Sequence, residues 1–319
     1  MEVLVSVSCL VFNHAPYLRK TLDGFVNQKT NFPFEVIIHD DASTDGSSDI
    51  IREYCEKYPT LFRPIFQTEN QYRKGLKIPK TFVYPIARGK YIAICEGDDY
   101  WNDENKLQLQ ADYMEAHPDC SMCVHDTAFI DNDGNFMGSY LNGHRKDRDY
   151  SAHDIIRADG GGLFQTSSYF ARRHIIAERP ETFDITKIGD LPIAIYAGVA
   201  GYVHYIGRVM SCYRVGHTNS WCSRLDSNVD ALVRQRQAEY EDFTRMDQQT
   251  GYRYTKAFAI PRGLRLSIIY RKKLGVLKLL THPKHLVMVV RTHSHTICRR
   301  IRRLVLSKLR IKAEGSPVK

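Results

Sequence analysis

The sequence predicts an α/β protein with a mostly parallel central sheet flanked by helices, followed by a helical, basic C-terminal extension. Two observations on the 319 residues support this fold class. Over the first 130 residues, short apolar runs alternate with amphipathic stretches of helical period, which is typical of parallel sheets covered by helices. From about residue 228 the pattern becomes helical throughout, and basic residues accumulate.

Local signals predict the first two strand–helix pairs. Residues 3–11 are apolar and β-branched and therefore favour a strand. Pro16 suits the first turn of a helix that we expect to end near Gln28. A second strand is predicted at 34–38, and the polar loop after it offers N-caps to a helix over 47–57.

The next elements follow the same alternation. Residues 91–95 form a continuous apolar run, as a buried parallel strand does. A helix is predicted over 104–116, because its apolar residues share one face and Pro118 stops it. Residues 121–125 read as a further strand.

The rest of the chain is less regular at first. Turn signals occur at 132–134 and at 160–162. In the helical C-terminal part, we expect Pro261 and Pro283 to separate three helical pieces, because proline breaks helices. The predicted domains are a catalytic domain at 1–225 and a helical region at 226–319.

Charge is divided unevenly along the chain. Residues 1–255 hold 28 Lys and Arg against 35 Asp and Glu, whereas residues 256–319 hold 17 against one. Apolar residues at near-helical intervals lie among the arginines of 297–310, which predicts a cationic amphipathic helix that binds an anionic membrane surface. A solvated charged end is the alternative. Nucleic acid is not expected as a partner, because the tail lacks interleaved aromatic residues.

The cysteines and the apolar segments suggest where the protein works. Eight cysteines are scattered without a regular framework, and the pair Cys120 and Cys123 lacks a second pair at zinc spacing. No signal peptide and no apolar run long enough to cross a bilayer are evident. We therefore expect a cytoplasmic protein, peripheral on the inner face of the cell membrane.

Acidic residues follow two of the predicted strands. Asp40 and Asp41 end the second strand, and Glu96-Gly97-Asp98-Asp99 ends the strand at 91–95. In open α/β sheets, ligands bind beyond the carboxyl ends of the strands. Acids crowded at this edge favour a divalent cation bound with a nucleotide diphosphate, since like charges repel unless a cation separates them. Asp99 is predicted to bind the metal and Asp98 the ribose or a supporting position; a solvated acidic loop is the alternative.

These segments, taken together, resemble the bacterial family 2 glycosyltransferases, which use nucleotide-sugar donors on the Rossmann-like GT-A fold. The resemblance covers residues 3–222, and the acidic segment resembles the family's DXD-type metal site. Its carriers are the segments at 5–13, 38–46, 89–101 and 188–190, with Tyr213, Arg214 and Trp221.

The resemblance implies a donor site in the first 125 residues. The backbone of Leu10, Val11 and Phe12, with the neighbouring Asn13 and the side chain of Asp41, would hold the base, normally uracil. A second group would lie near the base and the diphosphate, although a polar surface loop is an equal alternative for it. This group consists of Asn70, Arg73 and Lys74.

The resemblance also implies a catalytic base and an acceptor side in residues 126–225. Asp190 matches the family's base, which takes the proton of the acceptor hydroxyl; a plain N-cap aspartate is the alternative. Arg214 and Trp221 are assigned to the diphosphate and acceptor side. His217 is a third metal ligand or a loop histidine, and Trp101 is a wall for the sugar or a core residue.

The predicted activity is therefore inverting and metal-dependent, with Mg²⁺ or Mn²⁺ as cofactor. A sugar would move from a nucleotide diphosphate donor, expected to be a UDP-sugar, to a hydroxyl of a surface polysaccharide or lipid-linked oligosaccharide. A sugar-phosphate nucleotidyltransferase is one rival, but the turn after the first strand contains no glycine. A non-catalytic membrane- or nucleic-acid-binding adaptor is the other.

Overall fold

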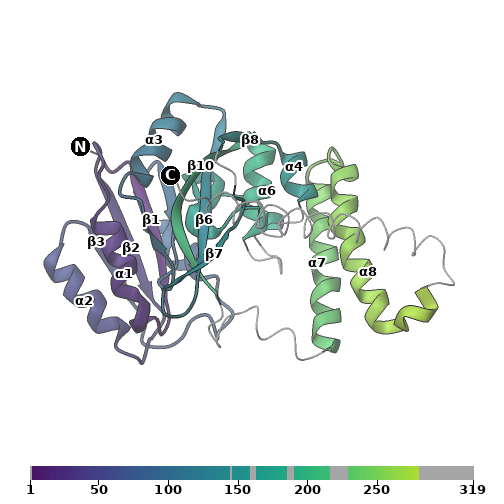
Figure 1. The fold of residues 1–319 in the computed structure, drawn as a ribbon, viewed down its shortest axis with the longest axis horizontal. Helices are drawn as coiled ribbons and strands as arrows, with labels where there is room; N and C mark the ends of the chain where they lie inside the picture. Colours follow the sequence, from purple (N-terminus) through teal and green to yellow (C-terminus); the bar gives the residue numbers. More distant parts are fainter. Residues whose placement is uncertain (1, 144–145, 159–162, 185–189, 216–228, 280–319) are drawn as a thin grey trace, which may run out of the picture. The chain divides into compact units, whose positions relative to one another are not determined.

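A computed structural model describes residues 2–143, 146–158, 163–184, 190–215 and 229–279 (Figure 1). The chain separates into two compact units. The first comprises residues 1–185 and 189–218, and the second comprises residues 186–188 and 219–319. The predicted boundary at residue 225 lies outside the described residues.

The first unit contains a ten-stranded sheet within the described residues. Its first four strands are parallel and lie in the order β3-β2-β1-β4. The predicted elements of this half are present: the strands β1 (Val5–Val11), β2 (Phe34–Asp40) and β4 (Tyr91–Ile94) and the helices α1 (Ala15–Val26) and α2 (Ser47–Lys57). The strand β3 (Phe62–Phe66) was not predicted.

The sheet continues beyond β4 with both strand directions. β9 pairs antiparallel with β4 and with β6, whereas β6 and β10 are parallel to each other. The short β5 pairs antiparallel with β10 and closes the order β4-β9-β6-β10-β5. The strands are β5 (Tyr100–Trp101), β6 (Cys120–Ile130), β7 (Phe136–Tyr140), β8 (Arg148–Tyr150), β9 (Phe170–Arg172) and β10 (Tyr202–Arg214).

Helices and single turns connect these strands. The longer ones are α3 (Lys106–Ala116), α4 (Ala152–Arg157), α5 (Arg173–Ala177) and α6 (Leu191–Ala200). The shorter turns are η1 (Pro79–Val83), η2 (Tyr84–Ile86), η3 (Thr166–Ser168) and η4 (Glu181–Phe183). The observed α/β architecture confirms the predicted fold class.

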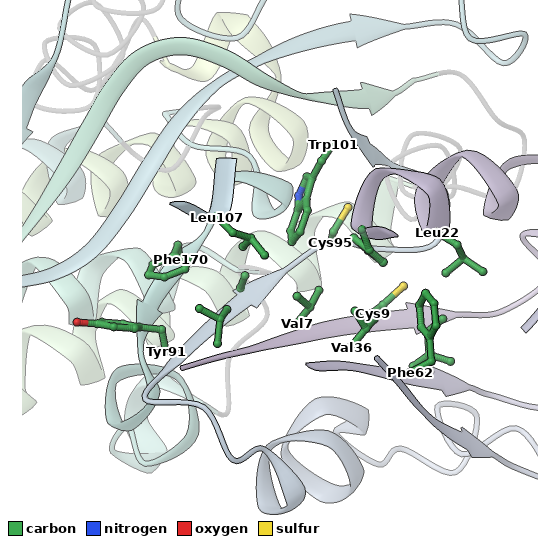
Figure 2. Close-up of a cluster of buried hydrophobic side chains, with 14 of the residues drawn as sticks. Val7, Cys9, Leu22, Val36, Phe62, Tyr91, Cys95, Trp101, Leu107 and Phe170 are labelled. Carbon is green, nitrogen blue, oxygen red and sulfur yellow. The ribbon is translucent and has the colours of Figure 1, made fainter. Parts of the chain in front are cut away.

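The main core lies between the sheet and the helices α1 and α3. Figure 2 shows Val7 and Cys9 of β1, Leu22 of α1 and Leu107 of α3 among its members. These four side chains are fully buried. Burying a large apolar side chain contributes about 1.5–3 kcal/mol, so this cluster holds the strand ends in place.

The second unit contains two helices, α7 (Val229–Gln249) and α8 (Thr255–Leu279). The prediction that Pro261 ends a helix is wrong, because α8 continues through it. The break lies instead at the turn before α8, where Gly251 and Tyr252 both have positive φ. Pro283 and the predicted membrane-binding tail lie outside the described residues. Among the described helices, none has the length and apolar character needed to cross a membrane.

Candidate active site

The ends of β1, β2 and β4 are joined to one another by backbone hydrogen bonds. The carbonyl of Leu10 accepts from the N–H of Gly97 over 2.9 Å, and the carbonyl of Val11 accepts from the N–H of Asp41 over 2.9 Å. Phe12 follows directly and is 37% exposed. The predicted base-binding backbone and both acidic segments therefore share one edge of the sheet.

Asn13 fixes the turn between β1 and α1. Its φ of 57° lies in the left-handed region that asparagine tolerates. Its N–H donates to Oγ of Ser43 over 2.9 Å, and its Oδ1 accepts from the N–H of Thr44 over 2.8 Å. The side chain of Asn13 therefore holds the loop after β2, which differs from its predicted nucleotide-binding role.

Asp41 is buried and anchors a loop that the sequence assigned to the donor. Its Oδ1 accepts from the N–H of Gln71 over 2.7 Å and its Oδ2 from the N–H of Tyr72 over 3.1 Å. The amide of Asn70 donates to the backbone carbonyl of Asp41 and accepts from the N–H of Arg73. Asp41 and Asn70 therefore shape this loop.

Several side chains of this loop are exposed to solvent. Arg73 and Lys74 are exposed, and Lys74 forms an ion pair of 2.5 Å with Glu69. Tyr72 is 64% exposed. The loop thus presents an aromatic ring and an arginine near the end of β2.

The acids after β4 alternate between two environments. Glu96 and Asp98 are partly exposed, whereas Asp99 is only 2% exposed. Oδ1 of Asp99 accepts from the backbone N–H of Arg214 over 3.0 Å. Asp99 is therefore turned into the protein, which argues against its predicted role as the metal ligand and favours Asp98 for a ligand-facing position.

Four carboxylates interact electrostatically at the end of β4: Glu96 with Asp190 and Asp98, and Asp99 with Asp98 and Glu96. The pKa of Glu96 is raised to about 8, first by burial and then by the charges of Asp190 and Asp98. Burial and the charges of Asp98 and Glu96 also raise the pKa of Asp99. The structure thus brings Asp190, which follows Glu96 by 94 positions, to the acidic end of β4.

His14 is a neighbour of this group that the sequence analysis did not assign. Its Nε2 lies 3.9 Å from Oδ2 of Asp98. A Cβ on Gly97 would lie 2.8 Å from Nδ1 of His14 and 2.9 Å from a methyl group of Val11. Only glycine at position 97 allows this close approach. The glycine between Glu96 and Asp98 was therefore the one sign in the sequence that another residue packs against this turn.

Asp190 is exposed at the start of α6 and does not act as a side-chain N-cap. Its Oδ2 instead accepts a hydrogen bond of 2.7 Å from Oγ1 of Thr166. Thr166 belongs to η3, so this bond joins η3 to the start of α6. The other two hydroxyls of η3 bond elsewhere: Ser168 donates to the carbonyl of Gln165, and Ser167 bonds to Ser211 of β10.

Trp101 is a core residue, so its predicted contact with the sugar is wrong. It is 3% exposed, and its Nε1 donates to the carbonyl of Ser167 over 2.9 Å. Its ring packs edge-on against Phe25, with 4.8 Å between centroids. Because the side chain of Trp101 is buried, its indole ring has no open face for a ligand.

Arg214 is also buried, at 4% exposure, and supports the site from within. Its Nε donates to the carbonyl of Asp98, and one terminal nitrogen donates to the carbonyls of Asp131 and Asn132. Its guanidinium carbon lies 4.0 Å from the ring centroid of Tyr17. Because these partners are protein atoms, Arg214 holds the β4–β5 and β6–β7 turns together. This arrangement differs from the predicted contact with the diphosphate.

Some predicted residues fall outside the described ranges, namely His217 and Trp221. Among the residues that the structure describes, no group of three or more His, Cys, Asp or Glu side chains has an arrangement that could hold a metal ion. All six described cysteines are free thiols.

Comparison with known proteins identifies the family. Residues 6–178 match the family model described as Glycosyl transferase family 2. The chain is 34% identical over 223 residues to the uncharacterized protein Rv1520 of Mycobacterium tuberculosis, a match that covers 69% of this chain and 61% of that protein. The chain thus spans about three fifths of the length of this relative.

A shorter match concerns a named enzyme of Escherichia coli. The chain is 33% identical over 113 residues to WfaP, a UDP-Glc:alpha-D-GlcNAc-diphosphoundecaprenol beta-1,3-glucosyltransferase, and the match covers 35% of this chain and 42% of WfaP.

Two solved structures share the fold. S. aureus TarS in complex with UDP-GlcNAc aligns with a TM-score of 0.59 at 15% identity, covering 91% of this chain and 79% of TarS. The mannosyltransferase PcManGT of Pyrobaculum calidifontis, in complex with GDP-Man and Mn²⁺, aligns with a TM-score of 0.55 at 17% identity, covering 99% and 89%. The resemblance seen in the sequence is thereby confirmed, and the chain belongs to glycosyl transferase family 2 and has its GT-A fold.

Proposed function

We propose that the protein transfers a glycosyl group, with inversion, from a nucleoside diphosphate donor to a hydroxyl of a saccharide acceptor. The observation that carries this proposal is the position of Asp190. Thr166 holds its carboxylate beside Glu96 and Asp98 at the carboxyl end of β4. The family match favours glycosyl transfer over the nucleotidyltransferase and adaptor hypotheses.

Asp190 is the proposed catalytic base. It is exposed, so an acceptor hydroxyl can reach it, and one of its oxygens is oriented by Thr166. A carboxylate that takes the proton of the attacking hydroxyl assists a single displacement at the sugar carbon. Because the leaving diphosphate departs from the opposite side, the configuration at that carbon inverts.

A divalent cation, Mg²⁺ or Mn²⁺, fits the donor set. Burial and then the charges of Asp190 and Asp98 raise the pKa of Glu96 to about 8, so several carboxylate oxygens lie close together at this end of β4. Mg²⁺ characteristically takes one or two protein carboxylates together with phosphate oxygens. We assign the ligand position to Asp98, with His14 beside it and Asp99 behind it. When bound, the cation would stabilise negative charge on the leaving diphosphate.

A UDP-sugar is the proposed donor, and a polysaccharide or lipid-linked saccharide the proposed acceptor. TarS, which shares the fold, was solved with UDP-GlcNAc, and the name of WfaP specifies UDP-Glc and a diphosphoundecaprenol-linked acceptor. We assign Phe12 and the loop at 70–76 to the donor side of Asp98 and Thr166 to the acceptor side. An acceptor of this kind would place the protein at the cytoplasmic face of a membrane.

Calorimetric titration with UDP, GDP and other nucleoside diphosphates, with and without Mn²⁺, tests the donor assignment. We expect UDP to bind best and its affinity to require the cation. Asp190→Asn should reduce turnover by about 10²–10⁴-fold, as expected for loss of a general base, while UDP affinity stays unchanged. Asp112→Asn, an exposed acid on α3, serves as the matched control. Loss of UDP affinity in Asp190→Asn, or full turnover by it, would contradict the proposed role.

A further inference from the structure

A cluster of three cations surrounds a single carboxylate near the candidate base. The cationic cluster consists of Lys77, Lys80 and Arg179, and the carboxylate is Asp184. Nζ of Lys77 lies 3.4 Å and Nζ of Lys80 lies 2.6 Å from Oδ2 of Asp184, while Arg179 bonds to Oδ1 over 2.6 Å. The three cations together with Asp184 therefore have a net charge of two positive units.

Stabilisation of the fold explains the pair of Arg179 and Asp184 but not the two lysines. The side chains of Asp184 and Arg179 are 4% and 11% exposed, so their pair is well buried and joins η4 to α5. Lys77 and Lys80 are 40% and 42% exposed. Lys80 donates to Oδ2 of Asp184, whereas Lys77 donates to the backbone carbonyl of Asp184 and lies near the same Oδ2. Two ammonium groups this close to one carboxylate repel each other, and the second ion pair adds little to the stability of the fold.

A single carboxylate faces three cations here, so the positive charge is not fully compensated. Burial is the main cause that lowers the pKa of Lys77, Asp184 opposes this shift, and the charges of Lys80 and Arg179 make smaller contributions that lower the pKa. A second anion, delivered by a ligand, would relieve this repulsion. The half-exposed lysines are the groups that such a ligand could reach.

Tyr84 relates the cluster to the active site. This tyrosine is buried at the start of η2, and its hydroxyl lies in the electrostatic field of Arg179 and Asp184 and also of Asp190 and Glu96. The charges of the cationic cluster and of the proposed base therefore act on the same hydroxyl, which relates the cluster to the acidic end of β4.

We propose that Lys77 and Lys80 bind an anionic group of the acceptor, a carboxylate or a phosphate, while one of its hydroxyls lies against Asp190. The proposal rests on the function proposed above and narrows it to acidic saccharides or phosphate-bearing acceptors. The buried pair of Arg179 and Asp184 supports the lysines, and an acceptor without negative charge gains nothing from them.

The test measures binding of short oligosaccharides to the full chain with UDP and Mn²⁺ present. The probes are a hexagalacturonate, a short poly(ribitol phosphate) and the uncharged xylohexaose. The Lys77→Gln, Lys80→Gln double variant leaves Arg179 and Asp184 paired. The control is the Lys29→Gln, Lys90→Gln double variant, which removes two comparably exposed lysines that pair with Glu104 and Glu115.

The unaltered protein and the control should bind at least one anionic probe more tightly than xylohexaose, with an affinity that falls as salt is added. The Lys77, Lys80 variant should lose about tenfold or more of that affinity and keep its affinity for UDP. Which anionic probe binds distinguishes a carboxylate from a phosphate.

Equal binding of charged and uncharged probes, or no binding of either anionic probe, would overturn the proposal. A fall in UDP affinity in the lysine variant would also overturn it, because the lysines would then contact the donor. Hydrolysis of UDP-sugars by the unaltered protein is measured in parallel without acceptor. If that hydrolysis is present, failure of the acceptor test leaves the proposed function standing.

Discussion

Thr166 donates its hydroxyl hydrogen to Oδ2 of Asp190 over 2.7 Å, across 24 positions of sequence. This bond fixes the direction of the carboxylate at the start of α6, where the aspartate does not bond to the helix backbone. One oxygen is thus oriented by η3, and the other is the one we assign to the acceptor hydroxyl. A base held in this way needs little reorganisation when the proton moves.

Removal of this hydroxyl tests the positioning role. Thr166→Val should lower kcat by about tenfold while the KM for the donor stays unchanged, because the carboxylate loses its orientation but the donor site is untouched. Thr166→Ser, which retains the hydroxyl, should restore most of kcat. Ser168→Ala is the control from the same turn, since Ser168 bonds only to a local carbonyl. Steady-state kinetics that give Thr166→Val a normal kcat would remove Thr166 from the mechanism.

The acidic segment shows how far sequence reasoning reaches and where it stops. Alternation along an extended chain indicates that Asp98 and Asp99 point to opposite sides, but not which side is open. In the structure residues 96–99 form a turn in which the N–H of Asp99 donates to the carbonyl of Glu96 over 3.2 Å. Asp99 is buried and Asp98 is partly exposed. Only this three-dimensional arrangement decides which of the two aspartates a ligand can reach.

Substitution of the two neighbouring aspartates should separate their roles. Asp98→Ala should reduce the Mn²⁺-dependent affinity for UDP by tenfold or more with little change in stability, since Asp98 is the proposed metal ligand. Asp99→Ala should instead lower the free energy of unfolding by about 1–3 kcal/mol, because the buried N–H of Arg214 loses its acceptor. Titration of UDP with and without Mn²⁺ and urea unfolding measure the two effects. The opposite pattern would return the metal to Asp99.

The fold was predictable wherever burial imposed a simple pattern. β1, β2 and β4 are buried along almost their whole length and therefore read as apolar runs. β3 was missed because it lies at the sheet edge, is only partly buried and contains Pro64, which edge strands tolerate. β10 was missed because register shifts interrupt its alternation against β6.

Other misses arose from contacts between residues distant in sequence. Nothing near Arg214 reveals that its partners are backbone carbonyls in the β4–β5 and β6–β7 turns. Trp101 likewise follows an acidic loop but packs inward, because β5 pairs with β10. Pro261 does not end α8, which shows that a proline in the second turn can remain within a packed helix. Such outcomes depend on tertiary contacts that local patterns do not contain.

Gly97 should tolerate no side chain. A Cβ there would approach Nδ1 of His14 and a methyl group of Val11 within 3 Å. Gly97→Ala should therefore cost about 1–3 kcal/mol of stability and weaken UDP binding, because the His14 ring is displaced from Asp98. In a double-mutant cycle with His14→Ala, the two losses of stability should be less than additive, since the smaller residue makes room. Strict additivity in urea unfolding would show that the two positions are independent.

The buried Lys106 should make the stability of the folded protein depend on pH. It is fully buried, its Nζ donates to Oε1 of Gln110 over 2.7 Å, and it lies 4.0 Å from the ring centroid of Trp101. Burial lowers its pKa from 10.5 to about 7. Between these two values the unfolded chain holds a proton that the folded protein has released. Stability contributed by this group is therefore lowest below pH 7 and rises with pH through the window up to 10.5.

Lys106→Met removes this titration and should change the slope of stability against pH. Relative to the unaltered protein, the variant should lose about 1.4 kcal/mol of unfolding free energy for each pH unit between 7 and 10. Its stability relative to the unaltered protein should therefore be highest in mildly acidic solution. Loss of the partner for Oε1 of Gln110 adds a constant cost at every pH and does not affect the slope. Urea unfolding at pH 6, 8 and 9.5 measures the difference. Parallel stability curves would mean that Lys106 keeps its proton in the folded protein, held by Gln110 and the face of Trp101.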